Sequence, residues 1–306
     1  MKDVLRGITF FLTLIVLLGG VIMPQDEYGY NAAIRDKYDR LVEIDEPKIV
    51  LVGDSNVAFG IDSQKIEDTF NMPTINLGLH GGIGQTTLEA ELAKKNICDG
   101  DIIILLPADY GYDHSNIRDG VLGWMAVEND IELWKTFQLS DLPIMVKAFP
   151  TYLKKVMELW TNHEGNRVTS NIYNRNVFNE YGDVVFDRPQ NIMENGYIEN
   201  DGYNSKHLSE EMKQYWNNFN EIIIENGGTV VMSVPPILKE DLKISNSDLE
   251  KLEKELKEEL EFPVISNLED YIFPKEYFFD TNFHLNNSGR MIRTNLLIND
   301  LRNYGV

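Results

Sequence analysis

The stretch KIVLVGDSNVAFGID, residues 48–62, decides the fold. Its apolar run ends at the tripeptide Gly53-Asp54-Ser55. A short strand that is apolar throughout is typical of a parallel sheet covered on both faces. The turn that ends this strand has two interpretations. Either Asp54 or Ser55 caps the helix that follows, or Ser55 is presented beyond the sheet as a nucleophile, with its own N–H available to an oxyanion.

Apolar runs and amphipathic segments alternate along the rest of the chain, as in a sheet whose strands are joined by helices. Strands are predicted at residues 48–52, 74–77, 101–106, 229–234 and 263–266, and helices at 63–70, 85–96, 142–160, 209–225, 248–260 and 287–303. We therefore expect an α/β fold, a three-layer sandwich with a mainly parallel sheet, whose active site lies at the carboxyl ends of the strands.

The beginning of the chain predicts a membrane anchor. The stretch GITFFLTLIVLLGGVIM, residues 7–23, carries no charge and follows Lys2 and Arg6. As a helix, residues 7–25 would span roughly 28 Å, close to the thickness of a bilayer core. The basic flank predicts a cytoplasmic N-terminus and an exported main domain at the cell membrane. A cleaved signal peptide is the main alternative, although its apolar region would normally be shorter; a buried soluble helix is the third.

Three parts of the chain follow from these patterns. Residues 1–27 are the expected anchor, residues 28–47 a juxtamembrane helix, and residues 48–306 a single α/β domain. Within that domain, residues 107–207 are longer than any crossover requires and are rich in Asn, Gly and Tyr in their middle. We interpret them as an insertion over the strand ends, either a lid or a glycan-contacting surface.

Composition narrows the function. The 306 residues have a net charge of −21, from 49 acidic and 28 basic side chains. Such a chain repels nucleic acid and anionic membrane surfaces, so nucleic acid is not an expected partner and membrane attachment should be hydrophobic. The single cysteine, Cys98, excludes an intramolecular disulfide, and the five histidines lack zinc-type spacing. We expect no metal site and no organic cofactor.

Two further segments carry residues suited to acyl chemistry. In INLGLHGG, residues 75–82, the N–H of Gly78 could be a second oxyanion donor, or the glycines could only form a turn. In YFFDTNFHLNNSGR, residues 277–290, His284 could act as a general base oriented by Asp280. The alternative there is a surface histidine beside a helix N-cap.

The order of these pieces along the chain resembles the SGNH (GDSL-type) hydrolase superfamily. The family's first block matches Gly53-Asp54-Ser55, its second matches Gly78, and its fifth matches Asp280 and His284. The resemblance covers residues of about 48–106 and 228–303 and leaves the insertion unmatched. It implies that Ser55, Asp280 and His284 are catalytic and that the N–H groups of Ser55 and Gly78 form the oxyanion hole.

Two departures from the family pattern affect the site. The third block usually supplies an oxyanion-hole Asn, but residues 105–113 here read LLPADYGYD. The last block is normally Asp-x-x-His, whereas Asp280 and His284 are four positions apart. We therefore expect a tight turn that lets Asp280 bond to one ring nitrogen of His284 while the other faces Ser55. Further candidates for substrate contact are Asp54, Asn56, His80 and Asn282.

Membrane-anchored members of this superfamily esterify cell-envelope polymers, and the layout of this chain is similar to theirs. The alginate-type O-acetylation proteins and the D-alanine transfer protein of teichoic acids are examples. The resemblance implies an O-acyltransferase or acylesterase that acts on an extracytoplasmic polysaccharide through an acyl-Ser55 intermediate, with a multi-pass membrane acyltransferase as an expected partner. The alternatives are a broad esterase or lipase, and a catalytically degenerate domain that binds glycan or docks on such a membrane acyltransferase.

Overall fold

The computed structural model describes residues 2, 6, 7, 9, 10, 13, 28–82, 87–110, 119–129, 134, 135, 137, 139–161, 172–193, 203 and 205–306. The expected anchor, residues 1–27, lies almost wholly outside these residues. None of the helices in the described ranges combines the length and the apolar character that crossing a membrane needs.

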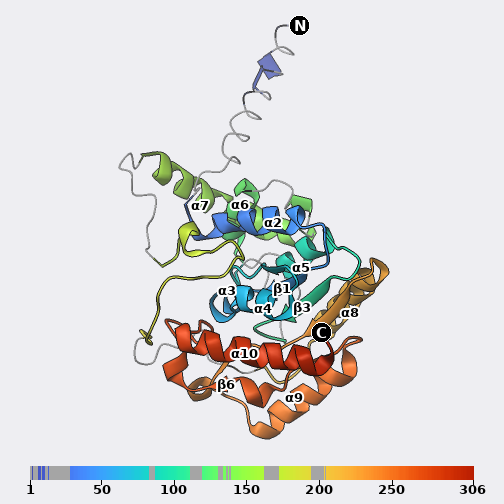
Figure 1. Cartoon of the computed structure of the whole chain (residues 1–306). Coiled ribbons are helices and arrows are strands. Elements are labelled where there is room, and N and C mark those ends of the chain that lie inside the picture. Colours follow the sequence, from blue (N-terminus) through green and yellow to red (C-terminus); the bar gives the residue numbers. More distant parts are fainter. Residues whose placement is uncertain are drawn as a thin grey trace.

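Four parallel strands form the central sheet, as the sequence predicts (Figure 1). They are β1 (Ile49–Gly53), β2 (Thr74–Asn76), β3 (Ile102–Leu106) and β4 (Thr229–Met232), in the order β2-β1-β3-β4. The predicted strand at 263–266 is reduced to one bridge between Val264 and Met232. A second, two-stranded parallel sheet pairs β5 (Ile237–Leu238) with β6 (Ile272–Phe273).

Successive residues of a strand point to opposite faces of the sheet. Because both faces are apolar here, helices cover both of them. Val50 and Val52 belong to one buried cluster, while Ile49 and Leu51 belong to another. The helices are α2 (Ala33–Glu43), α3 (Ser55–Gly60), α4 (Ser63–Phe70), α5 (Thr87–Lys94), α6 (Gly120–Asn129), α7 (Leu142–Thr161), α8 (Glu210–Glu225), α9 (Asn246–Glu259) and α10 (Asn287–Tyr304). The α/β class and the parallel sheet are confirmed.

Two helices differ from the expectations. The sequence did not predict α6, and it placed the first helix of the domain later than α3, which begins directly at Ser55. The expected juxtamembrane segment forms the short 3-10 turn η1 (Tyr30–Ala32) followed by α2. The α2 helix contributes Ile34 and Leu41 to the core, so it packs on the domain rather than extending away from it.

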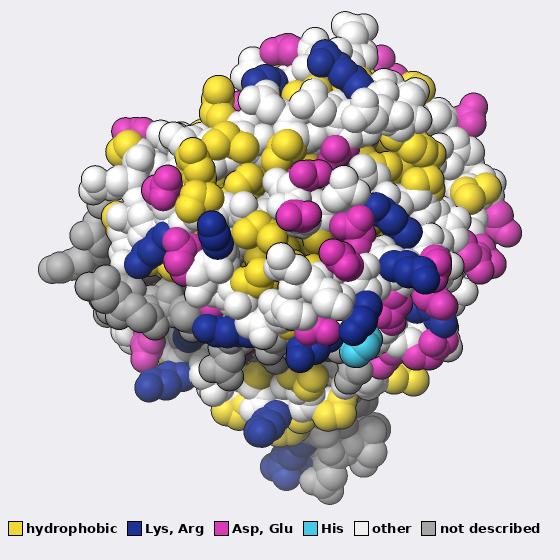
Figure 2. All heavy atoms as spheres, turned by 90° about the horizontal axis from the view of Figure 1, so that it is seen from below, with side chains coloured by type: hydrophobic (Ala, Val, Ile, Leu, Met, Phe, Trp, Pro, Cys, Tyr) yellow, Lys and Arg dark blue, Asp and Glu magenta, His cyan; other side chains and the backbone are white. Residues whose placement is uncertain are grey.

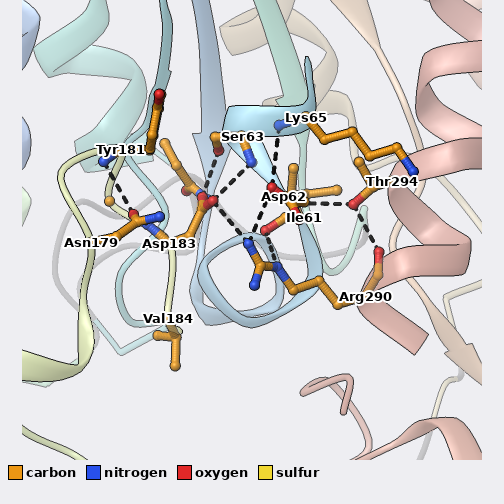
Figure 3. A network of polar contacts seen from close by, with 12 residues as sticks. Ile61, Asp62, Ser63, Lys65, Asn179, Tyr181, Asp183, Val184, Arg290 and Thr294 are labelled. Atoms are coloured by element: carbon orange, nitrogen blue, oxygen red, sulfur yellow. Dashed lines mark hydrogen bonds and ion pairs between the residues drawn. The ribbon is translucent and has the colours of Figure 1, made fainter. Parts of the chain in front are cut away.

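Part of the insertion, residues 172–193, is fastened to the sheet and to two helices through the buried carboxylate of Asp183 (Figure 3). Asp183 accepts hydrogen bonds from the Ser63 N–H (2.8 Å), the Ser63 hydroxyl (2.5 Å) and the Asn76 amide (2.8 Å). It also pairs with Arg290 of α10 at 3.3 Å. These bonds join residues far apart in the sequence, so this part of the insertion belongs to the framework around the strand ends.

Candidate active site

In the turn after β1, one residue caps the following helix and the next residue keeps its hydroxyl available. Asp54 is the N-cap of α3, and its Oδ1 accepts the N–H of Asn56 at 2.8 Å. Ser55 is the first helical residue and is half-buried. Because Asp54 caps the helix, the Ser55 hydroxyl is free for another partner.

That partner is His284, whose Nε2 lies 2.9 Å from Ser55 Oγ. The Nδ1 of the same ring lies 2.9 Å from Asp280 Oδ1. The structure therefore brings the three residues of the expected catalytic group into one hydrogen-bonded chain. In such a chain, a carboxylate holds the ring proton on Nδ1, which leaves Nε2 to accept the hydroxyl proton.

The four-residue spacing between Asp280 and His284 is accommodated by a tight turn. Thr281 Oγ1 accepts the His284 N–H at 3.1 Å, and the Phe279 N–H donates to the His284 carbonyl at 2.8 Å. An antiparallel bridge between Phe278 and Leu285 closes the base of the turn. These bonds hold the turn that brings Asp280 and His284 together.

The imidazole of His284 is held on one side by Phe59 of α3. The two rings are stacked, with centroids 3.9 Å apart and planes inclined by 7°. The buried guanidinium of Arg188, from the insertion, donates to the carbonyls of Phe59 (2.6 Å) and Leu285 (2.8 Å). Arg188 therefore ties the helix that carries Ser55 to the turn that carries His284.

Tyr173 is a member of this site that the sequence did not single out. Its hydroxyl donates to Asp280 Oδ2 and lies 3.4 Å from His284 Nδ1. Burial raises the pKa of Asp280, but the hydrogen bond and electrostatic attraction of His284, together with the hydrogen bond from Tyr173, outweigh burial and hold that pKa below its ordinary value. The only sequence signal was the abundance of tyrosine in the insertion.

The two predicted oxyanion donors, the N–H groups of Ser55 and Gly78, differ in whether they already have a hydrogen-bond acceptor. A Cβ on Gly78 would lie 2.6 Å from the carbonyl oxygen of Asp54, so only glycine allows this close packing. The Gly78 N–H donates to Asn76 Oδ1 at 2.9 Å and thus already has an acceptor. Within the described part of the chain, the N–H groups of Ser55 and Gly81 have no such acceptor, and Gly81 lies against the Asp54 side chain.

His80 is a neutral hydrogen-bond donor in this loop. Burial lowers its pKa below the ordinary value, although the negative charge of Asp54 opposes the shift. Its Nδ1 accepts the Gly82 N–H at 2.9 Å, so the proton of the neutral ring lies on Nε2. Among the residues expected to contact substrate, His80 therefore offers an N–H rather than a base.

Two of the other candidates for substrate contact are bound to protein groups. Asn56 is fully buried, donates to the Leu106 carbonyl (3.2 Å) and accepts from Arg293 (2.8 Å). Asn282 is also buried, and its amide donates to Asp241 at 2.6 Å. These contacts give both residues a structural role, whatever else they do.

Among the described residues directly after β3, residues 107–110, no side chain is an amide that could donate to the oxyanion. Asp109 accepts the Ser205 hydroxyl at 2.6 Å and is an acceptor when ionised. Within the described ranges, no three His, Cys, Asp or Glu side chains come together as metal ligands would.

No family model and no curated protein matches this chain.

Proposed function

We propose that this protein is an SGNH-type O-acyltransferase or acylesterase. The observation that carries the proposal is the hydrogen-bonded chain from Ser55 Oγ through His284 to Asp280, with both bonds at 2.9 Å. A serine at the first position of a helix after a parallel strand, facing a histidine that is itself oriented by a carboxylate, is an arrangement suited to nucleophilic acyl transfer.

The first half-reaction forms an acyl-enzyme. Ser55 Oγ attacks the ester carbonyl carbon while His284 Nε2 takes the hydroxyl proton, and Asp280 stabilises the resulting imidazolium. The N–H groups of Ser55 and Gly81 donate to the oxyanion, and the His80 Nε2–H is a further donor of the same loop. When the tetrahedral intermediate collapses, the ester C–O bond breaks and His284 returns the proton to the departing alcohol.

The second half-reaction uses the same groups in reverse. A hydroxyl group, from a sugar or from water, attacks the acyl-Ser55 carbonyl while His284 removes its proton. The Ser55 C–O bond breaks and His284 then reprotonates Ser55. Transfer to a sugar gives an acyltransferase, and transfer to water gives an esterase.

The proposed substrate is an extracytoplasmic cell-envelope polysaccharide, either as the acceptor of an acyl group or as the acyl ester that is hydrolysed. This part rests on the apolar stretch at residues 7–23, which favours a membrane-anchored chain with an exported domain, and on the resemblance of the motifs to envelope acyltransferases. A multi-pass membrane acyltransferase is the proposed source of acyl groups, and the chemistry needs no cofactor.

A second candidate function is a degenerate domain that binds glycan or docks on a membrane acyltransferase without turnover. The observations that favour it are the missing amide after β3 and the engagement of the Gly78 N–H by Asn76. Both reduce the number of donors available to an oxyanion.

A fluorophosphonate probe distinguishes the two functions. In an active site, Ser55 Oγ forms a bond to phosphorus, fluoride leaves, and His284 takes the proton. We expect mass spectrometry to find the adduct on the peptide containing Ser55 and to find none in Ser55→Ala. Lack of labelling in the native chain, with an intact fold, would favour the degenerate domain. Competition between water and added glycan for the acyl group of an ester substrate then shows whether the protein is an esterase or a transferase.

A further inference from the structure

An apolar stripe runs along the exposed side of α7. Leu142, Val146 and Met157 are 42%, 70% and 59% exposed, and Leu139, in the turn before the helix, is 85% exposed. At about 100° per residue, Leu142, Val146 and Met157 fall within one narrow sector of α7, and Leu139 lies just before its first turn. Leu153 lies in the same sector and is half-buried.

A second apolar face of α7 already has a partner. Met145, Tyr152 and Val156 are almost fully buried, and the Tyr152 ring stacks on Trp124 of α6 with centroids 5.7 Å apart. The helix is therefore held on the domain by one face, and the stripe of Leu139, Leu142, Val146 and Met157 is not needed for that packing. A soluble surface rarely leaves a continuous apolar stripe without a function.

The charges beside the stripe have the opposite sign to the protein as a whole. Lys147 and Lys154 lie on the flank of the stripe together with Glu158, whereas Lys155 lies on the opposite side of the helix, so the charges beside the stripe sum to +1 (2 − 1) while the chain carries −21. On the face seen from below, at the other end of the molecule, hydrophobic side chains are interspersed with acidic and basic ones (Figure 2).

The stripe lies at the end of the molecule where the N-terminal segment joins it. The α6 helix packs on α7 and also contacts η1, which begins two residues after Tyr28. Figure 1 shows α2, α6 and α7 together at one end and α9, α10 and β6 at the other. If residues 7–23 enter a bilayer, the end that carries α7 is thus the one nearest to it.

We propose that the exposed face of α7 docks on an anionic lipid bilayer as an interfacial helix. Its apolar stripe would enter the boundary between headgroups and acyl chains, and Lys147 and Lys154 beside the stripe would contact anionic headgroups. The acidic remainder of the chain is repelled by the same surface, so the contact orients the domain with α7 toward the membrane and α10 away from it. This proposal goes beyond the proposed function and shares with it only the membrane segment at residues 7–23.

Fluorescence quenching in nanodiscs tests the proposal with the full chain. In a Cys98→Ser background, single cysteines replace Val146 or Met157 and carry a polarity-sensitive fluorophore. Met291, which is 51% exposed on α10, provides the matched control position. Each protein is reconstituted in nanodiscs of phosphatidylethanolamine and phosphatidylglycerol, with brominated acyl chains as the lipid quencher and iodide as the aqueous one.

We expect labels at 146 and 157 to be quenched several-fold more by brominated lipid than by iodide, and the label at 291 to show the reverse. Replacing Lys147 and Lys154 together by Gln should reduce lipid quenching at 146 and 157, with unchanged retention of the chain in the nanodiscs. Quenching at 146 by iodide alone, in chain that co-elutes with nanodiscs, would overturn the proposal and leave the anchor intact.

Two other results would also overturn it. Shielding of position 146 from both quenchers would mean that protein, not lipid, covers the stripe. Elution of the chain apart from the nanodiscs would exclude the anchor together with the docking. None of these outcomes bears on labelling of Ser55 by a fluorophosphonate, so failure of this proposal is distinguishable from failure of the proposed chemistry.

Discussion

At the scale of single residues, the site depends on the different roles of two adjacent residues, Asp54 and Ser55. Asp54 caps α3 through the Asn56 N–H, and this leaves Ser55 Oγ to His284. A serine that capped the helix itself would have its oxygen occupied by a backbone N–H. Asp54 therefore has a structural role as the helix cap, independent of any contact it makes with substrate.

Replacement of the nucleophile or the base should abolish turnover. We expect Ser55→Ala and His284→Ala each to lower kcat/KM for a model acetyl ester on the order of 10³-fold or more, and Asp280→Asn to be milder but still severe. The control is Ser245→Ala, which removes the exposed N-cap of α9 and should retain activity. Near wild-type activity in Ser55→Ala would refute the mechanism.

Tyr173 should matter through Asp280. A hydrogen bond to a charged group contributes roughly 1.5–3 kcal/mol, so its loss in Tyr173→Phe should lower kcat about tenfold or more, with a smaller change in KM. The pKa of Asp280, followed by NMR, should rise, because a bond that lowers it is removed. Tyr181→Phe, which loses only a bond to Glu67, is the control. An unchanged pKa of Asp280 would show that Tyr173 does not orient it.

At the scale of elements, the insertion supplies part of the site rather than merely covering it. Residues 172–193 carry Tyr173, Asp183 and Arg188, which contact the His284 turn, the α3–α4 region and the carbonyl of Phe59. The groups bonded by Asp183 and Arg188 are buried and need a partner, whereas Asp280, bonded by Tyr173, is partly exposed and also bonds to His284. The expectation of a lid or a glycan-contacting surface stays a prediction for the rest of residues 107–207.

Removal of the Asp183 carboxylate should loosen this segment. Asp183→Ala leaves the Ser63 and Asn76 donors without their acceptor, and we expect a loss of about 3 kcal/mol in the free energy of unfolding. Urea denaturation measures it. The control is Asp187→Ala, an exposed carboxylate bonded to Asn287, which should change the same free energy by no more than about 0.5 kcal/mol. Equal effects in the two variants would contradict the structural role of Asp183.

Lys37 of α2 should make stability depend on pH in the alkaline range. Burial lowers its pKa to about 7 while its amine bonds to the carbonyls of Asn76 and Gly182. Between about pH 7 and the ordinary lysine pKa, the unfolded chain binds a proton at Lys37 that the folded chain does not, so this residue's contribution to stability rises with pH. In Lys37→Met that rise should disappear, as urea denaturation at pH 6.5 and 9 can check. An identical pH dependence in both proteins would exclude a lowered pKa.

At the scale of the whole molecule, the sheet separates two cores, and the ends of the domain differ in character. The end with α6 and α7 joins the apolar N-terminal segment, while Ser55 lies at the carboxyl end of β1. A chain of this charge has no electrostatic reason to stay on an anionic membrane as a whole. Its retention there would have to come from apolar residues and from local basic side chains.

The full-length chain should remain in the membrane pellet after a carbonate or high-salt wash, because burial of an apolar span of about 17 residues is insensitive to both treatments. The measurement is immunoblotting of pellet and supernatant, with a peripheral membrane protein of the same cells as control. Release of a shortened chain into the medium would favour the cleaved signal peptide instead.

Local patterns in the sequence determined much of this protein. Apolar runs of strand length predicted the four parallel strands, and the tripeptide at the end of β1 predicted where Ser55 lies. These features are readable because side-chain periodicity and turn chemistry involve neighbours in the chain. The expected contacts of Ser55, His284 and Asp280 are present in the structure, while their catalytic roles stay predictions.

Only the tertiary structure decided which distant groups complete the site. Tyr173 meets Asp280 across 107 residues, and Arg188 meets Phe59 across 129. The acceptor of the Gly78 N–H, by contrast, is two residues away, yet it depends on the side-chain conformation of Asn76, which Asp183 holds from the insertion. No periodicity encodes such contacts, because they arise from the need of buried polar groups to find partners once the chain has folded.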